Sequence, residues 1–231
     1  AWDKVAATGK EPLRVEVLVR LGQQDESLSR WELSVAKPKN MRLTQVRFPR
    51  VPSLRERIEE VLAVPRELGA LARNPRSLTR GKDNQGTRLA WRYPFVMAMQ
   101  CLAFYQDNGP GFYAACDDSQ GHRKEFALWG DAQARVHFEV LYEPEQEAAE
   151  LAEFRLPFAV VLGAFHGDWT TAARLYRESP AAKTIAGCST CFNPSLPDRH
   201  PDRPRLRGHL PSHAFPTSTR RGCLPVAAKW N

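Results

Sequence analysis

Two adjacent carboxylates, Asp117 and Asp118, are the residues of this chain that most invite a hydrolytic interpretation. Glycoside hydrolysis uses two carboxyl groups that flank the bond, about 5–5.5 Å apart in retaining enzymes and about 6.5–9.5 Å apart in inverting ones. Adjacent residues on a strand point to opposite faces, so this pair cannot easily flank one bond. We therefore expect a strand-end or turn role, with Asp117 as a candidate polar contact to a sugar or to a neighbouring domain. No catalytic residue is assigned.

Zinc binding is the second chemistry that the residue types allow. A Cys pair, Cys188 and Cys191, is followed by a His pair, His209 and His213. The 17 residues between the two pairs exceed the roughly 12 residues of a nucleic-acid-binding finger. Four of these 17 residues are prolines, whereas such a finger needs a hairpin and a helix there. Chance pairing in a tail is the favoured interpretation, and no cofactor is predicted. The weak candidate ligands are Cys188, Cys191, His209 and His213.

The positive charge is concentrated at one end of the chain. Of the net +7, residues 181–231 carry +6, because they hold eight Lys/Arg and two Asp. A basic arm binds nucleic acid weakly at low salt, but no aromatic interleaving supports specific stacking. Specific nucleic-acid binding is not expected, and the body of the chain is nearly neutral.

Alternation of apolar and polar residues predicts the first strands. The pattern runs over residues 13–21 and again over 31–35, and a further strand is expected from Met41 to Phe48, ended by Pro49.

A short helix is predicted next. The sequence Ser53 to Glu56 resembles a capping box, and apolar residues on one helical face continue to Leu62 before Pro65. Residues 73–86 are polar and contain turn signals, so a loop is expected there.

Residues 91–106 are apolar on both faces, which is typical of buried central structure. The turn sequence at 107–111 favours a hairpin of central strands. Cys101 and Cys116 lie in these runs and are expected to be buried free thiols. Further strands are expected at 125–129, 134–142 and 158–162, with a solvated acidic connection over 143–153. These elements predict an antiparallel β-sandwich, because each sheet must cover its apolar face with another.

The chain changes character near residue 180. A helix capped by Asp168 is predicted over 168–178, with Trp169, Ala172, Ala173 and Tyr176 on one face. Residues 181–231 contain seven prolines and few large apolar residues, so a disordered Pro/Arg/His-rich tail is expected after a domain of residues 1–180. No apolar run is long enough to span a membrane, and no compartment is predicted.

An ordered series of short motifs resembles a known family. The series is Trp31-Glu-Leu-Ser-Val35, Val46-Arg-Phe-Pro49, Tyr93-Pro94, Met99-Gln100, Tyr105, Gly111-Phe-Tyr113, Asp117, Lys124, Leu156-Pro157, Val160-Val-Leu-Gly163, Gly167-Asp-Trp169, Ala172-Ala173 and Tyr176-Arg177. It is similar to the N-terminal β-sandwich region of bacterial glycoside-hydrolase-like proteins related to α-galactosidase and endo-α-N-acetylgalactosaminidase enzymes. The resemblance covers about residues 13–178.

The resemblance implies a galactose-mutarotase-like supersandwich that precedes a (β/α)₈ barrel with the catalytic carboxylates. It implies that the final helix joins the two domains through Asp168, Trp169, Tyr176 and Arg177. Because 181–231 show no barrel pattern, we expect a truncated or frame-shifted end, and no glycosidase activity from this chain alone. The expected partner is carbohydrate or the missing barrel. Candidate sugar contacts are Trp91, Tyr93, Tyr113, Asp117, Lys124 and Trp129, although aromatics in a sandwich more often fill the core.

Two other functions stay open at this stage. The first is a stand-alone carbohydrate-binding module, and the second is a zinc- or nucleic-acid-binding protein that acts through the tail.

Overall fold

The computed structural model describes residues 2–5, 13–22, 27–38, 41–80, 87–133, 135–146, 150–179 and 182. The chain separates into two units, 1–192 and 193–231, and every described residue belongs to the first. The tail predicted over 181–231 lies outside the described residues except at Ala182, so the boundary near 180 stays a prediction.

Two antiparallel sheets form the body, as predicted. The larger sheet contains β1 (Trp2–Val5), β2 (Leu13–Leu21), β3 (Leu28–Ala36), β5 (Glu60–Val64), β6 (Ala70–Arg73), β8 (Cys101–Gln106), β9 (Gly109–Asp117), β12 (Glu153–Arg155) and β13 (Ala159–Gly167). Its order is β1-β2-β3-β13-β9-β8-β5-β6, and β12 also pairs with β3. The smaller sheet has the order β4-β11-β10-β7, with β4 (Val46–Leu54), β7 (Arg88–Tyr93), β10 (Lys124–Gly130) and β11 (Val136–Tyr142).

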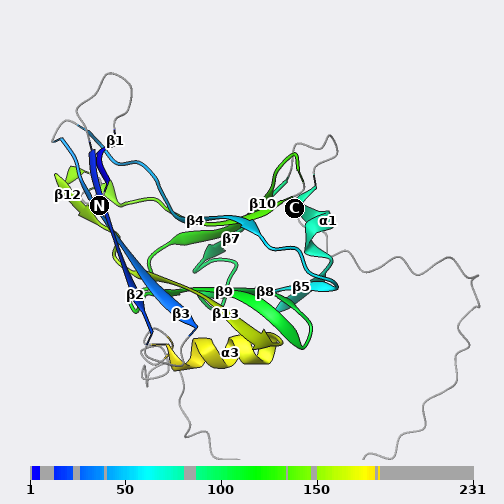
Figure 1. Ribbon diagram of the computed structural model, residues 1–231. Helices are drawn as coiled ribbons and strands as arrows, with labels where there is room; N and C mark the ends of the chain where they lie inside the picture. Colours follow the sequence, from blue (N-terminus) through cyan, green and yellow to red (C-terminus); the bar gives the residue numbers. More distant parts are fainter. Residues whose placement is uncertain are drawn as a thin grey trace, which may run out of the picture. The chain divides into compact units, whose positions relative to one another are not determined.

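The core lies between the facing sheets (Figure 1). Phe112 of β9 meets Phe138 of β11 edge to face, with ring centroids 5.3 Å apart, and Trp31 of β3 lies 6.3 Å from Phe48 of β4. Such aromatic contacts join the layers, and burial of the rings stabilises the fold.

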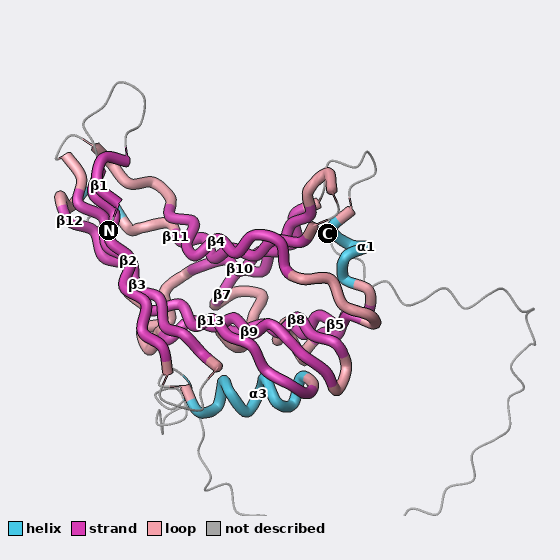
Figure 2. Tube along the Cα trace, viewed as in Figure 1, coloured by secondary structure: helices cyan, strands magenta, loops and turns pink. Residues whose placement is uncertain are grey.

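One helix covers the outer side of the larger sheet. Figure 2 shows α3 (Trp169–Glu178) lying along the side of β9 and β13 that faces away from the smaller sheet. Its buried residues Ala172 and Tyr176 join a cluster with Tyr105, Tyr113 and Phe165. The position of the predicted helix is thus confirmed, and Ala172 and Tyr176 are buried, but Trp169 of the predicted apolar face is 50% exposed.

The helix predicted from Ser53 is wrong. Leu54 ends β4, while Val61 and Leu62 belong to β5, which pairs with both β6 and β8. Ser53 has a φ of 55°, whereas an N-cap residue has extended backbone. Pairing with two strands satisfies the backbone of β5, so the helical spacing is overridden.

Two neighbouring predictions also need correction. The strand expected from Met41 to Phe48 begins at Val46 and continues past Pro49 to Leu54. Proline is tolerated there because β4 is an edge strand, so its nitrogen need not donate to a partner. The loop predicted over 73–86 contains a short helix, α1 (Pro75–Thr79), and residues 81–86 lie outside the described part.

The long apolar run divides into two elements of different sheets. β7 ends at Tyr93 and β8 begins at Cys101, and the intervening Phe95 is 87% exposed rather than buried. The hairpin of β8 and β9 is confirmed, with its turn at Asp107 and Asn108. No helix among the described residues is long and apolar enough to cross a membrane.

Both strand cysteines are buried free thiols, as predicted. Burial raises the pKa of Cys101 to about 12 and also raises that of Cys116. Both are therefore protonated at neutral pH and act as small core side chains.

Candidate functional site

The side of the larger sheet that carries α3 holds most of the candidate residues. Asp168 accepts hydrogen bonds from the backbone nitrogens of Thr170 and Thr171, at 2.9 and 3.3 Å, and so begins the helix. The hydroxyl of Tyr176 accepts from the backbone nitrogen of Gln100 at 3.4 Å, which fixes the helix to the sheet. Arg177 is exposed.

An open apolar pocket of about 400 Å³ lies between α3 and the β5–β6 hairpin. Trp169, Ala172 and Ala173 contribute from the helix, and Leu68 and Leu71 from the hairpin. Leu68 is fully exposed, Leu71 is 57% exposed and Trp169 is 50% exposed. The helix therefore has one apolar side on the sheet and presents a large aromatic ring to solvent at its start.

A smaller, polar pocket of about 250 Å³ lies near the other end of α3. Its lining includes Arg30, Asp117, Leu175 and Glu178. Asp117 Oδ2 lies 2.9 Å from Arg30 Nε, while its buried Oδ1 has no hydrogen-bond partner in the described structure. Burial raises the pKa of Asp117, and Arg30 partly opposes that effect.

Asp118 turns into the sandwich instead. Its carboxylate binds the buried ammonium group of Lys124, accepts from the backbone nitrogen of Gly121 at 3.1 Å and lies 2.9 Å from His122 Nδ1. Lys124 Nζ also donates to Gln100 Oε1 at 2.7 Å. Burial tends to raise the pKa of Asp118, but hydrogen bonds from Lys124 and His122 outweigh it, so the pKa is lowered. This ion pair links β10 to the segment that follows β9, and the two aspartates have different charged partners.

The six predicted sugar contacts are not brought together on one surface. Trp91, Tyr93, Tyr113 and Lys124 are buried, and Asp117 lies on the α3 side. Trp129 is half-buried on the outer face of the smaller sheet, where it stacks on His137 with ring centroids 4.0 Å apart. Sugar binding by this set stays a prediction.

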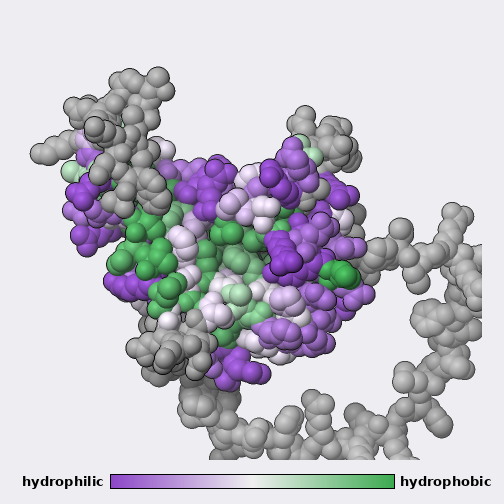
Figure 3. All heavy atoms as spheres, in the orientation of Figure 1, coloured by the Kyte–Doolittle hydropathy of each residue, from purple (hydrophilic) through white to green (hydrophobic). Residues whose placement is uncertain are grey.

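A second apolar surface lies on β2. Leu18, Val19 and Leu21 are exposed there, and Figure 3 shows hydrophobic residues gathered over β2 and β3. Alternation in the sequence located this strand, but it could not show that half of its apolar residues stay uncovered.

The candidate zinc ligands Cys188, Cys191, His209 and His213 lie outside the described residues. Within the described residues, no group of three or more His, Cys, Asp or Glu is arranged to hold a metal ion.

Several residues of these sites were not found from the sequence. Arg30 gave no signal and Gln100 entered only through the resemblance series, because their partners are distant in the chain. Arg88 and Arg92 of β7 share one face by alternation, which was a usable signal, but Arg47 and Arg50 of β4 are three residues apart and reach one face only through a register shift opposite β11.

Comparisons with known proteins find structural similarity between part of this chain and part of one enzyme. No protein-family model and no curated protein matches it. Among solved structures it is similar to the alpha-N-acetylgalactosaminidase NagBb from Bifidobacterium bifidum. With the GalNAc complex, the TM-score is 0.46 at 14% identity over 78% of this chain and 31% of the enzyme. With the ligand-free enzyme, the TM-score is 0.43 at 16% identity, over 80% and 33%. The chain thus spans about a third of the length of that glycoside hydrolase.

Proposed function

We propose that this chain is the non-catalytic β-sandwich domain of a glycoside-hydrolase-like protein. Residues 1–180 would form the domain and 168–178 its linker helix. In this role the α3 side packs on a (β/α)₈ catalytic barrel and holds it in place. The observation that carries the proposal is the open apolar pocket beside Trp169, at the helix that the sequence resemblance assigns to the domain junction.

The exposure of the pocket's rim supports a covered surface. Leu68, Leu71 and Trp169 would gain about 25 cal/mol for each Å² of apolar surface removed from water. Contiguous apolar surface of this kind on a domain marks a contact with another domain or protein. The polar pair Arg30 and Asp117 lies at the other end of the same helix and supplies charged groups for the rim of such a contact.

The described residues favour this role over a stand-alone carbohydrate-binding module. Such a module needs several exposed aromatic rings on one surface, whereas Trp91, Tyr93 and Tyr113 lie in the core and, of the predicted aromatic contacts, Trp129 alone is partly exposed. The alternative based on zinc or nucleic acid depends on the tail, outside the described residues.

The first test begins with the gene. We expect a barrel-coding frame downstream of the part that encodes this chain. We also expect the barrel, when it is expressed separately, to bind this chain in a titration. Trp169→Ala with Leu68→Ser should weaken that binding about tenfold or more, because they remove apolar contact at the pocket. Leu21→Ser is the matched control, since this exposed leucine lies on β2, and it should leave binding unchanged. Absence of a barrel-coding frame, or equal weakening by the control, would refute the proposal.

The second test concerns activity. The purified chain should release no more aryl alcohol from aryl α-galactosides or aryl α-N-acetylgalactosaminides than a heat-inactivated sample. Turnover above that background would show that the sandwich itself is catalytic.

A further inference from the structure

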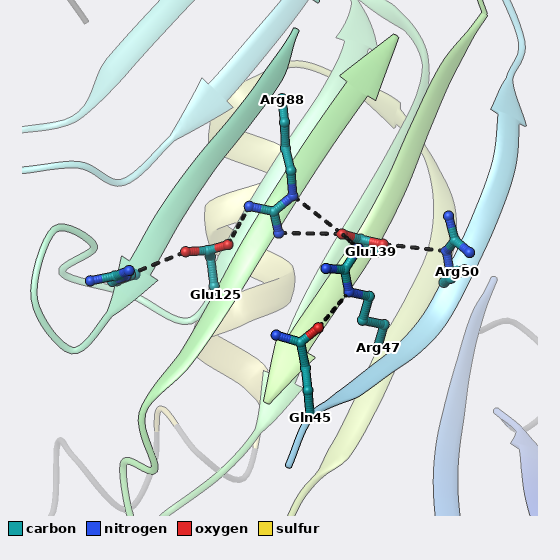
Figure 4. Close-up of polar contacts among 7 residues, drawn as sticks. Gln45, Arg47, Arg50, Arg88, Glu125 and Glu139 are labelled. Carbon is teal, nitrogen blue, oxygen red and sulfur yellow. Dashed lines mark hydrogen bonds and ion pairs between the residues drawn. The ribbon is translucent and has the colours of Figure 1, made fainter. Parts of the chain in front are cut away.

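Three guanidinium groups converge on one carboxylate at the outer face of the smaller sheet (Figure 4). Arg88 donates to Glu139 Oε1 from Nε at 3.3 Å and from Nη2 at 3.2 Å. Arg47 Nη1 lies 3.7 Å from the same oxygen, and Arg50 Nε lies 3.3 Å from Oε2. The arginines come from β4 and β7, and Glu139 comes from β11 between them in the sheet.

Glu139 is almost fully covered although it lies on an outer face. Its neighbours Phe138 and Val140 point into the core, so the alternation of β11 places Glu139 on the opposite side. Its side chain is 1% exposed, whereas those of Arg47, Arg50 and Arg88 are 48, 56 and 35% exposed. The arginines therefore form the surface and the carboxylate lies beneath them.

The arrangement leaves an excess of positive charge at one point. Three positively charged guanidinium groups surround the single negative charge of Glu139, so two positive charges are not balanced by that residue. Arg88 also pairs with the carboxylate of Glu125. Including Glu125 and its second partner Arg92, the group of ion pairs connected to Glu139 contains four arginines and two glutamates, a surplus of two. One arginine would suffice to neutralise Glu139, so structural pairing does not account for the other two.

The arginines are also held in position before any ligand arrives. Arg88 is fixed between two carboxylates, and Arg47 Nε donates to Gln45 Oε1 at 2.8 Å. The guanidinium carbon of Arg50 lies 5.5 Å from the ring centroid of Trp129. Such preorganisation lowers the entropy lost on binding.

We propose that Arg47, Arg50 and Arg88 form a binding site for an oxyanion group, such as a carboxylate or a sulfate ester, above Glu139. Guanidinium groups recognise these groups through paired, charge-assisted hydrogen bonds. A bound oxyanion would relieve the repulsion among the three arginines. The site lies on the side of the sandwich opposite α3 (Figure 1), so it does not depend on the proposed packing against a barrel.

Isothermal titration of the full chain at constant ionic strength tests this site. The probes are sodium sulfate, galactose 6-sulfate, galacturonate and galactose. We expect saturable binding of at least one oxyanion and none of galactose. Binding of sulfate alone would indicate a free anion, whereas preference for a charged sugar would indicate an acidic glycan. Absence of saturable binding for every oxyanion would overturn the proposal.

Variants distinguish binding at this site from non-specific electrostatic attraction. Arg47→Gln with Arg50→Gln should weaken binding about tenfold or more, since each loses charge-assisted hydrogen bonds. Arg20→Gln with Arg155→Gln is the matched control, because both arginines are exposed, pair with a glutamate and lie on the other sheet. Equal weakening by both pairs would show non-specific attraction and refute the site.

Glu139→Gln should change the affinity for the oxyanion in the opposite direction. The surplus charge at the three arginines rises by one, so oxyanion binding should become tighter. Unchanged or weaker binding by this variant, with its fold confirmed by circular dichroism, would contradict the electrostatic argument. Arg50→Gln alone, which removes an exposed side chain, serves if either of the other variants fails to fold.

Discussion

Asp117 and Asp118 are adjacent in the chain, yet their carboxylates have opposite environments. Asp117 reaches Arg30 on the α3 side, and its other, buried oxygen has no hydrogen-bond partner among the residues that the structure describes. Asp118 lies between the sheets with Lys124, His122 and two backbone nitrogens. The pKa of Asp117 is raised and that of Asp118 is lowered, because one loses hydration with a single partner and the other gains several donors.

These shifts predict opposite contributions to pH-dependent stability. A lowered carboxyl pKa stabilises the fold above the unfolded value, about 3.9, and this stabilisation is lost as the pH falls through the lower folded value. Asp118→Asn should therefore reduce the loss of unfolding free energy that occurs as the pH falls below about 4. Asp117→Asn is the paired variant. A raised carboxyl pKa lowers the unfolding free energy as the pH rises above about 4, and this variant should reduce that loss. Urea unfolding at several pH values measures both slopes, and slopes of the same sign would contradict the assignment.

At the scale of elements, local sequence signals predicted the correct structure where an element supplies its own cap and its own buried face. The helix α3 begins at Asp168 as predicted, because the aspartate supplies its own cap and the apolar spacing supplies a buried face. The segment after Ser53 carries similar local signals but becomes part of β4 and β5, because the neighbouring strands offer backbone partners. A capping pattern thus predicts a helix only when no strand partner competes for the backbone.

The cap of α3 should have a measurable effect. Asp168→Ala removes the acceptor for the nitrogens of Thr170 and Thr171 and should cost about 1 kcal/mol of unfolding free energy. Arg174→Ala, at an exposed position of the same helix, is the control and should change stability by less than about 0.5 kcal/mol. Denaturant titration compares the two, and equal values would mean that the cap contributes nothing specific.

At the scale of the molecule, we expect the sandwich to resist digestion as one unit. Its two sheets share a core of buried aromatic rings, and α3 closes the outer side of the larger sheet. Limited proteolysis with intact-mass readout should therefore leave a product ending near residue 180, with or without a zinc chelator. Protection of the segment from Cys188 to His213 that is lost on adding chelator would instead support a zinc site and would argue against the predicted tail.

The sequence by itself determined the type and approximate position of several elements. Alternation located β2, β3 and β11, and the helical spacing located α3, because burial of one face is a local property of the pattern. Only the tertiary structure decided which strands are neighbours. It places β13 between β3 and β9, and it brings Arg47 and Arg50 within reach of the carboxylate that binds Arg88. The physical reason is that alternation specifies the face of a strand but not its partner, which is chosen by contacts between residues far apart in the chain.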